Sequence, residues 1–505
     1  MRAEALRLLD RAAPSDPEAC YRAGLAALRC DLAEQGIPIL AAAVRAHPRE
    51  ARLWQVLGLA YRRLEEHEPA ISAFARAAEL DPANPLIAHS LARVALEAGL
   101  PATALFARAV ALAPDDLSVA LGQAAARFAE GHASAAIDGL DQRLGLQPGW
   151  LEGHATAARL RWMCGERDGF TVSLERALTA APRIAPLWQQ LVAIHMEGKL
   201  YDRALEALAR ARRSAGPRPE FDAAEAVCRS ELGELEDADR MFERLGAPVD
   251  AAAAASRARH LLRAGRPEEA VRLAEAWRGR DPGHLLWPYL ALAWRLTGDP
   301  RWRWLEGDPS FVGVYDIGDR VGSLDALAST LRGLHHAVQQ PLEQSLRGGT
   351  QTDGPLFARI EPEIRALRRA VLATIEEHVA GLPPVDPDHP LLSPRRAPIR
   401  FSGAWSVRLT DGGYHAEHVH PQGWLSSAFY VACPEDSIGD GDGDHSGWLA
   451  LGEARELGLD LPPIEMVRPR PGRLVLFPST LWHGTRSFPA GERLTVAFDV
   501  ARTHD

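Results

Sequence analysis

Two patterns of apolar and polar positions divide the chain. In roughly the first three hundred residues, large apolar residues recur at helical spacing, which predicts amphipathic helices. From residue 400 onward, short apolar runs alternate with glycine, proline and aspartate, which indicates β-strands separated by turns. The predicted strands are RFSGAWSVRL, WLSSAFYVA, SGWLAL, RLVLFP and RLTVAFDVA. The pattern therefore predicts a helical N-terminal part and a β-rich C-terminal part.

The helical part repeats itself. Prolines recur with a period near 34 residues, which is the signature of stacked helix-turn-helix units. These prolines stand at positions 14, 48, 82, 114, 148, 182, 217, 248 and 282. One such unit cannot bury its apolar face alone, whereas about eight or nine stacked units can. We therefore predict an α-solenoid over residues 1–300.

Residues 51–84 resemble the tetratricopeptide repeat (TPR). The large residues of the pattern form the apolar stripe of the first helix, the small ones let two helices approach, and the proline ends the second helix. The pattern positions are filled by Trp54, Leu57, Gly58, Tyr61, Ala70, Phe74, Ala77 and Pro82. The resemblance implies a concave surface that holds a peptide or protein partner. The alternative is a plain scaffold or dimerisation arm, so a homo-oligomer stays open.

Beyond the last of these prolines the repeat period ends. Residues 284–310 contain four tryptophans, for which we expect a capping helix with aromatic packing rather than a ligand cage. Residues 311–317 are predicted as a strand, and residues 324–339 and 356–381 as helices. We assign residues 301–395 to a capping and helical support region for the β-rich part.

Two further segments connect these elements. Residues 344–354 (QSLRGGTQTDG) are polar and contain glycine, so we predict a connecting loop. The alternative is a contact at the rim of a site, through Arg347, Gln351 and Thr352. Residues 382–399 are rich in proline and are expected to run extended over the surface. Residues 396–505 then form the β-rich core, as a sandwich or barrel.

Composition narrows the classes of function. A net charge of -10 over 505 residues argues against a surface for nucleic acid or an anionic membrane. The five cysteines are scattered and lack CxxC pairs, which favours reduced thiols and a cytoplasmic protein. The N-terminal run RAEALRLLDRAA lacks the apolar core of a signal peptide, and no apolar stretch suits a membrane span. The length predicts more than one domain.

The most informative motif is His418-Val419-His420, which His483 and Arg493 follow later in the chain. Residues 418 and 420 share one face of an extended segment, because side chains alternate along a strand. A third imidazole from a later strand would complete a facial set of three ligands on a first-row metal. Arginine is always charged and binds carboxylates through two hydrogen bonds. The motif therefore predicts a metal site beside an anchor for an acidic cosubstrate.

The C-terminal segments resemble the iron(II)- and 2-oxoglutarate-dependent oxygenases, especially the prolyl-hydroxylase-like branch. The resemblance lies in GGYHAEHVHP, WLSSAFYV, RPGRLVLFPSTLWHG, GERLTVAF and the loop QSLRGGTQT. It covers about residues 310–505 and implies a double-stranded β-helix (jelly roll) with flanking helices. It also implies Fe(II), 2-oxoglutarate and O2 as the cofactor and cosubstrates.

The resemblance implies roles for individual residues. Fe(II) would be held by His418 and His483, with His420 as the third ligand of this chain. The distal carboxylate of 2-oxoglutarate would be bound by Arg493, assisted by Thr495, and the serine–tyrosine strand would contribute Ser426 and Tyr430 to the cosubstrate site. The substrate would be contacted by Arg347, Gln351 and Trp424.

This sequence departs from the family at the second metal ligand. The family has an aspartate or glutamate two residues after the first histidine, and this chain has His420. Three neutral histidines provide one negative charge less, so iron would be held less tightly. Its affinity would fall as the imidazoles protonate below about pH 6.5. The neighbouring His415 and Glu417 would point to the opposite face of a straight strand.

Two other metal sites compete with this interpretation. The first histidine pair also fits the start of the cupin motif, but a cupin would continue with a glutamate where this chain has Gly423 and Trp424. The run GDGDGDH (439–445) begins like a calcium loop that starts at Asp440, yet the sixth and twelfth positions of that loop are His445 and Leu451 instead of glycine and glutamate. We therefore predict a solvated hairpin tip there, and packing for Cys433.

These observations predict a multidomain α + β protein, with an all-α TPR superhelix followed by a double-stranded β-helix. The predicted function is a 2-oxoglutarate- and Fe(II)-dependent dioxygenase that hydroxylates a peptide or protein held by the TPR array. The alternative is a non-catalytic TPR scaffold whose cupin-like metal domain is vestigial or acts as a sensor.

Overall fold

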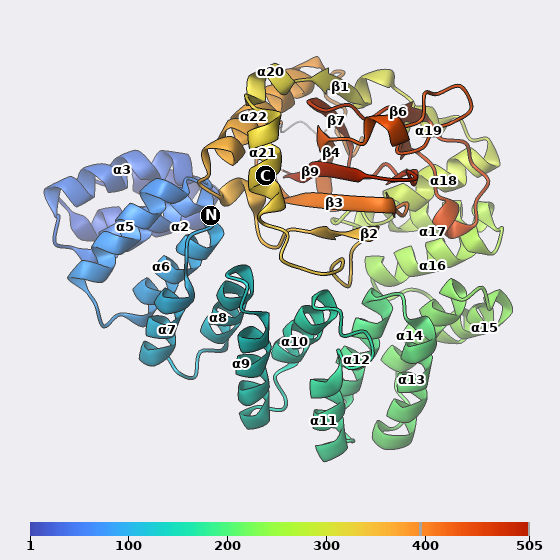
Figure 1. Cartoon of the computed structure of the whole chain (residues 1–505), viewed down its shortest axis with the longest axis horizontal. Helices are drawn as coiled ribbons and strands as arrows, with labels where there is room; N and C mark the ends of the chain where they lie inside the picture. Colours follow the sequence, from blue (N-terminus) through green and yellow to red (C-terminus); the bar gives the residue numbers. More distant parts are fainter. Residues whose placement is uncertain (393–395, 503–505) are drawn as a thin grey trace. The chain divides into compact units, whose positions relative to one another are not determined.

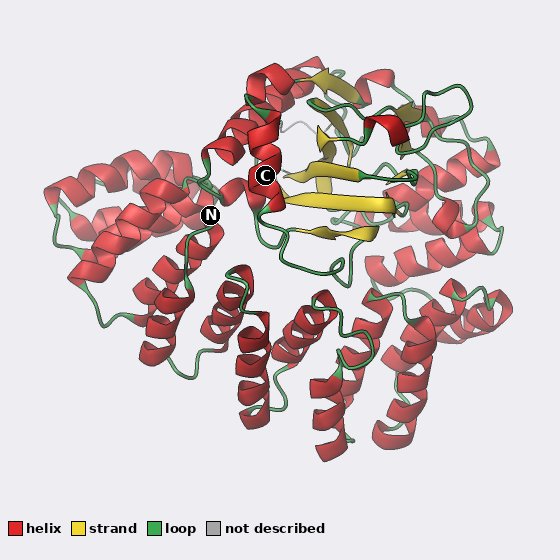
Figure 2. Ribbon diagram, in the orientation of Figure 1, coloured by secondary structure: helices red, strands yellow, loops and turns green. Residues whose placement is uncertain are grey.

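The computed structural model describes residues 1–392 and 396–502, which form two compact units. The first unit comprises Met1–Gln142 and Asp353–Arg365, and the second comprises Arg143–Thr352 and Ala366–Asp505. Among the described residues, no helix has the length and apolar character needed to cross a membrane. Figures 1 and 2 show the helices and strands.

The first unit is built from paired antiparallel helices. Its helices are α1 (Arg2–Arg11), α2 (Pro17–Arg29), α3 (Ala33–Ala46), α4 (Ala51–Arg63), α5 (His67–Leu80), α6 (Pro85–Glu97), α7 (Thr103–Leu112), α8 (Leu117–Ala129) and the 3₁₀ helix η3 (Leu356–Ala358). Two helices continue from one unit into the other, α9 (Ala133–Leu146) and α22 (Pro362–Gly381).

The pair α4–α5 explains the repeat pattern. Phe74 of α5 is fully buried against Gly58 of α4, where a Cβ atom would come within 2.9 Å of its ring. The glycine therefore allows the two helices to approach, as ridge-and-groove packing requires. Pro82 follows the end of α5, as expected. The prediction of a TPR unit over residues 51–84 is confirmed.

The helical array continues in the second unit. Its helices there are α10 (Leu151–Met163), α11 (Val172–Ala180), α12 (Ala185–Glu197), α13 (Tyr201–Ala215), α14 (Pro219–Glu231), α15 (Leu235–Leu245), α16 (Ala251–Arg263), α17 (Pro267–Trp277), η1 (Arg278–Arg280), α18 (Trp287–Thr297) and α19 (Arg301–Glu306). The tryptophans of α18 and α19 pack together, with ring centroids of Trp287 6.4 Å from Trp294 and 6.0 Å from Trp304. This is the aromatic packing that the sequence predicts.

Two antiparallel sheets follow. The larger has six strands in the order β1-β7-β4-β9-β3-β2, and the smaller has the order β6-β5-β8. The strands are β1 (Gly313–Asp316), β2 (Leu346–Gln351), β3 (Phe401–His415), β4 (Gly423–Ala432), β5 (Leu449–Leu451), β6 (Glu465–Val467), β7 (Arg473–Pro478), β8 (His483–Thr485) and β9 (Glu492–Ala501). The predicted order, a helical part followed by a β-sheet domain, is confirmed, and the sheets are antiparallel.

Short helices support the sheets. They are η2 (Pro309–Phe311), α20 (Gly318–Val321), α21 (Leu324–Arg332), η4 (Glu435–Ser437) and η5 (Arg455–Leu457). The helix predicted over 324–339 ends at Arg332, because the next segment is tied to the sheet. There His335 Nδ1 lies 2.8 Å from Thr350 Oγ1, and its Nε2 lies 3.2 Å from Ser406 Oγ. The helix predicted from 356 begins at Pro362, since the residue before a proline disfavours helix.

The prediction of a connecting loop over residues 344–354 is wrong, because this segment contains strand β2. It pairs with β3 and carries a bulge between Arg347 and Gly349. Gly348 has a φ of +73°, and a Cβ on Gly349 would overlap the carbonyl oxygen of Arg408. Two glycines are therefore needed for the bulge, and they hide the strand from a propensity-based prediction.

Within the second unit, an apolar cluster joins the helices to the loops around the small sheet. Leu261 of α16 and Leu292 of α18 pack with Leu457 and Trp482. The indole N–H of Trp482 donates to the carbonyl of Pro288 at 3.2 Å. Because Trp482 immediately precedes His483, this cluster fixes the start of β8.

Candidate metal centre

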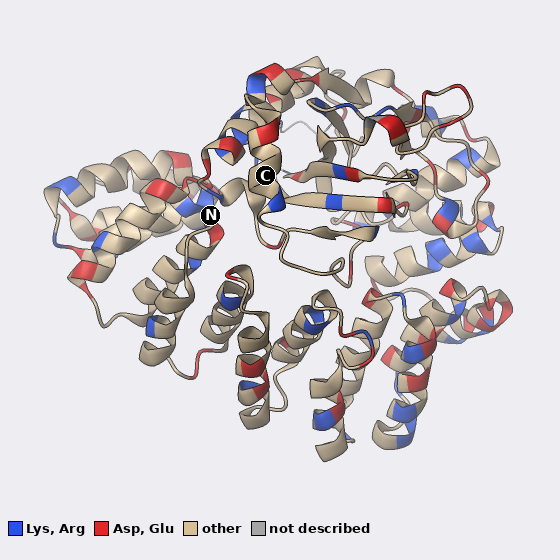
Figure 3. Cartoon of the chain, viewed as in Figure 1, with Lys and Arg blue, Asp and Glu red and all other residues tan. Residues whose placement is uncertain are grey.

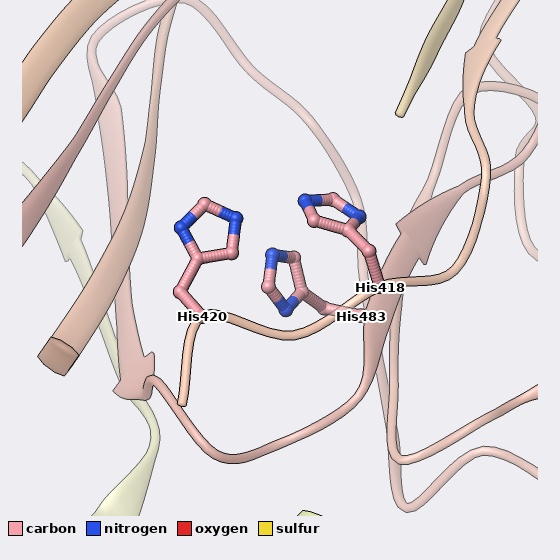
Figure 4. A group of neighbouring side chains, drawn as sticks. All are labelled: His418, His420 and His483. Atoms are coloured by element: carbon pink, nitrogen blue, oxygen red, sulfur yellow. The ribbon is translucent and has the colours of Figure 1, made fainter. Parts of the chain in front are cut away.

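Three histidines converge between the two sheets. The ligand nitrogens of His418, His420 and His483 all lie within 4.8 Å of one another, and Figure 4 shows the three rings grouped together. His418 and His483 form an isolated antiparallel bridge with reciprocal backbone hydrogen bonds of 2.9 and 3.0 Å. His420 is held by a backbone bond to Ser479. Val419, between the first two histidines, packs on the apolar cluster instead.

Each of the three rings is oriented through its Nδ1 atom. Nδ1 of His418 lies 2.8 Å from the carbonyl of Ala416, and Nδ1 of His483 lies 2.9 Å from that of Leu481. Nδ1 of His420 lies 2.5 Å from a carboxylate oxygen of Asp499. Carbonyl and carboxylate acceptors place the proton on Nδ1. The three Nε2 atoms therefore keep a lone pair, which is the arrangement found around metal-binding histidines.

Burial favours the neutral form of the His418 and His483 imidazoles. Desolvation, and then the charge of His420, lower the pKa of His418 to about 3. Desolvation also lowers the pKa of His483 well below its ordinary value. Metal binding requires the neutral imidazole. For His418 and His483, burial therefore shifts protonation of the ring to a more acidic pH than is usual for histidine.

His415 lies in the same cavity, contrary to the expectation that it faces away. Ser345 Oγ is 3.3 Å from both His415 Nδ1 and His418 Nε2. The expectation assumed a straight strand, whereas β3 ends at His415 and the chain turns before the next histidine. Glu417 does point elsewhere, because its carboxylate accepts hydrogen bonds of 2.9 and 2.7 Å from Arg455.

An arginine without a carboxylate partner faces this cavity. Arg493 is 1% exposed, and it donates to the carbonyl of Gly447 at 2.8 Å and to Thr485 Oγ1 at 2.9 Å. Its Nε has no partner, and no described carboxylate pairs with the guanidinium. Desolvation lowers its pKa. A buried charge of this kind is costly unless an anion compensates it.

Tyr430 adds a second unused donor to the same cavity. Its hydroxyl is buried without a hydrogen-bond partner among the described residues, and desolvation raises its pKa. Thr495 also lines the cavity, because it lies two residues beyond Arg493 on the same face of β9. A cavity with a buried guanidinium, a phenol and a threonine is suited to a carboxylate.

The other predicted site residues divide into two groups. Ser426 lines the cavity and donates to Asp499 at 2.6 Å. Trp424 lies outside its lining, with an indole N–H that donates to the carbonyl of Leu391 at 2.8 Å. Arg347 and Gln351 lie on β2, and Arg347 lines a separate groove. The structure therefore does not bring these last three residues to the histidines.

Sequence reasoning missed Asp499 and Trp405. The ring of Trp405 stacks beside His420, with centroids 6.0 Å apart and an angle of 18°. Asp499 lies four residues beyond Thr495 on β9. Because side chains alternate along a strand, Asp499 shares the face of β9 that carries Arg493 and Thr495. This alternation could have identified Asp499 from the sequence.

The competing calcium site forms a turn. In residues 439–445, Asp440 accepts from the backbone N–H of Asp442 at 3.0 Å, and Asp444 accepts from that of Ser446 at 2.8 Å. These three aspartates are exposed. The segment is the solvated hairpin tip that the sequence predicts.

Comparison with known protein families adds to this geometry. Residues 403–499 match the family described as "Putative 2OG-Fe(II) oxygenase", and residues 51–84 match "Tetratricopeptide repeat". The chain joins an oxygenase-family segment to TPR repeats. The oxygenase match begins within β3, ends in β9 at Asp499, and includes all three clustered histidines. The comparison with curated proteins gave no match.

The solved structures that match include proteins titled as TPR proteins. A tetratricopeptide repeat protein from Parabacteroides merdae is 16% identical, with a TM-score of 0.31 over 45% of this chain and 91% of that one. YrrB, titled a TPR protein with an unusual peptide-binding site, is 17% identical, with a TM-score of 0.29 over 34% and 89%. MamA from Desulfovibrio magneticus is 17% identical, with a TM-score of 0.30 over 33% and 96%.

Proposed function

We propose that the C-terminal segment is an Fe(II)- and 2-oxoglutarate-dependent dioxygenase. The observation that carries this proposal is the buried Arg493, which lacks a carboxylate partner and shares a cavity with His418, His420 and His483. An arginine so placed calls for an anionic ligand beside the metal site. A metal site alone would not require it.

The three histidines would hold Fe(II) through Nε2. Their Nδ1 atoms are already engaged, and imidazole is a common ligand for iron. The family places a carboxylate at the second ligand, and here Asp499 supplies a negative charge one hydrogen bond behind His420. A carboxylate on the far nitrogen makes an imidazole more basic. The site therefore recovers part of the charge that three neutral ligands lack.

The remaining residues would bind and orient the cosubstrate. Arg493 would pair with the distal carboxylate of 2-oxoglutarate, with Tyr430 and Thr495 as further donors at the same end. Trp405 and Phe477 line the cavity and would limit access of water. When bound, Fe(II) and 2-oxoglutarate supply the activation of O2 for hydroxylation of a C–H bond, with succinate and CO2 as products. The role of the protein is to bind and position the reactants.

The substrate class follows from the rest of the chain. TPR repeats commonly bind proteins or peptides, which favours a peptide or protein substrate held by the helical array over a metabolite. The two antiparallel sheets with the histidines between them support a double-stranded β-helix as the fold of the metal domain. In this proposal residues 396–505 form the catalytic core, residues 301–395 support it, and residues 1–300 hold the partner.

Succinate formation tests the proposal. The full-length protein with Fe(II), 2-oxoglutarate and O2 is expected to release succinate, even without substrate, through uncoupled turnover. His483→Ala should abolish this release, whereas His195→Leu, which alters a buried histidine outside the cavity, should retain it. If the folded wild-type protein binds metal but forms no succinate, the alternative of a non-catalytic scaffold with a sensing or vestigial metal domain is favoured.

A further inference from the structure

The second unit contains a large groove beside β2. Its volume is about 810 Å³, against about 60 Å³ for the cavity at the histidines. Trp162 of α10 and loop residues such as Arg167, Lys199 and Gln339 line part of it, and four consecutive residues of β2, from Arg347 to Thr350, line another part. The groove is therefore large enough for a peptide segment, whereas the cavity at the histidines is not.

Positive charge dominates the groove. Four of its lining residues are basic, and none of the described lining residues is acidic; the basic ones are Arg167, Lys199, Arg347 and Arg408. Lys199 and Arg408 are paired with glutamates that lie outside the lining, Glu456 and Glu492. The other two have no carboxylate partner among the described residues.

The two unpaired arginines are held in place by neutral groups. Arg167 Nε donates to Gln339 Oε1 at 3.1 Å, and its guanidinium lies 5.8 Å from the ring of Trp162. Arg347 donates to the carbonyls of Gln344 and Leu346, both at 2.8 Å. Both guanidinium groups are therefore positioned while their charge stays available for an acidic ligand.

The groove also exposes the edge of a sheet. β2 is the last strand in the order of the larger sheet, so alternate residues direct backbone N–H and C=O groups away from β3. An extended peptide can add to such an edge through main-chain hydrogen bonds. Side chains alternate along a strand, so acidic residues two apart would lie on one face of the bound peptide.

The groove leads to the histidines along β2. Gln344 and Ser345 line the histidine cavity, Arg347 begins the groove, and only the buried Leu346 separates them in sequence. Ser345 Oγ lies 3.3 Å from His418 Nε2. A chain bound along β2 therefore ends beside the metal site.

We propose that this groove binds an extended acidic peptide segment, which adds as a strand to β2 and is anchored by Arg167 and Arg347. Docking of the peptide stands independently, whereas its role as the hydroxylation substrate rests on the proposed oxygenase function. Nucleic acid is the less fitting occupant, because Lys and Arg are interspersed with Asp and Glu along the surrounding helices, α13 for example (Figure 3), and the chain has a net charge of -10.

Fluorescence anisotropy of the full-length protein tests the charge requirement. The probe is a labelled eight-residue peptide of alternating glutamate and valine, added without Fe(II) or 2-oxoglutarate. It is expected to bind, with an affinity that falls as salt rises, whereas the lysine–valine counterpart should not bind. R167A/R347A should weaken binding at least about tenfold. The control R183A/R272A, which removes two exposed arginines outside the groove, should not.

N-methylated peptides test the strand addition without altering the protein. Two peptides are compared, one methylated on the odd-numbered backbone nitrogens and one on the even-numbered ones. One of them should lose binding and the other should keep it, because only one of the two sets of N–H groups faces β2. Binding unaffected by either register would overturn the proposal. So would equal binding of the lysine peptide or of single-stranded DNA, or full affinity in folded R167A/R347A. Uncoupled succinate formation needs no peptide. A negative result in the peptide-binding experiments would therefore leave the proposed oxygenase function untouched.

Discussion

At the residue scale, Asp499 adjusts one predicted metal ligand. Its carboxylate accepts from His420 Nδ1 and from Ser426 Oγ, so it both orients the ring and places a negative charge near it. Asp499→Asn keeps the size of the side chain and removes the charge. We expect the affinity for Fe(II) or Mn(II) to fall about 10- to 100-fold, measured by anaerobic metal titration. Asp316→Asn, on an exposed carboxylate paired with Arg473, is the matched control. Equal metal affinity in wild type and Asp499→Asn would contradict this role.

Arg493 is expected to contribute to binding of 2-oxoglutarate and not to the stability of the unliganded protein. Its charge is buried without a carboxylate partner, so replacing it by methionine should not lower the thermal midpoint of the unliganded protein. In wild type, 2-oxoglutarate with Mn(II) should raise that midpoint, because a ligand that binds only the folded state stabilises it. Arg493→Met should lose this increase while it still binds the metal.

Differential scanning fluorimetry measures both effects. Arg493→Met that responds to 2-oxoglutarate as wild type does would remove the guanidinium from the cosubstrate site. A large loss of stability without ligand would instead indicate a structural role for this arginine.

At the scale of elements, the bulge in β2 shapes the groove, because Arg347, Gly348 and Gly349 line it. A Cβ on Gly349 would overlap the carbonyl of Arg408, so Gly349→Ala must displace β2 from β3. We expect a loss of about 1–3 kcal/mol in the free energy of unfolding, measured by denaturant titration. Gly169→Ala is the control, because a Cβ there has open space. If both substitutions have the same small effect, β2 is not constrained as described.

The sequence predicted the elements with a strong period and missed those without one. The TPR pair and strands such as β4 and β9 follow from regular apolar spacing. Strand β2 was missed because its paired glycines are typical of a loop, and β6 was missed because three residues are too few to show alternation. The three histidines could be singled out by their spacing, but the position of His415 depends on where β3 ends. That end is set by tertiary contacts, which no local pattern records.

At the scale of the whole molecule, buried histidines predict a loss of stability in acid. Burial lowers the pKa values of His195, His335 and His378 to about 4. The unfolded chain binds protons at these residues near pH 6.5, whereas the folded chain does not. Stability is therefore lost as pH falls from about 6.5 toward 4, by up to about 1.4 kcal/mol per pH unit for each residue.

Thermal unfolding at pH 7 and at pH 5 checks this dependence. The midpoint should fall in acid, and His195→Leu should reduce the fall by removing one of the buried histidines with a lowered pKa. His445→Leu, at the hairpin tip, is the control and should leave the fall unchanged. A wild-type midpoint that is the same at both pH values would contradict the assignment of these histidines as buried and neutral.

The molecule as a whole combines repeats that suit a protein partner with a metal cavity that suits an acidic cosubstrate. The groove and the histidine cavity lie in the same unit, where β2 borders the groove and Ser345, the residue before β2, contacts His418. The division into residues 1–300, 301–395 and 396–505 stays a prediction.

The most direct measurement is an anaerobic titration of 2-oxoglutarate into the Fe(II)-loaded protein, followed by visible absorption. We expect a weak charge-transfer band that saturates with one 2-oxoglutarate per protein and that is absent in His483→Ala. A folded wild-type protein that binds Fe(II) but develops no band would contradict the proposed oxygenase site.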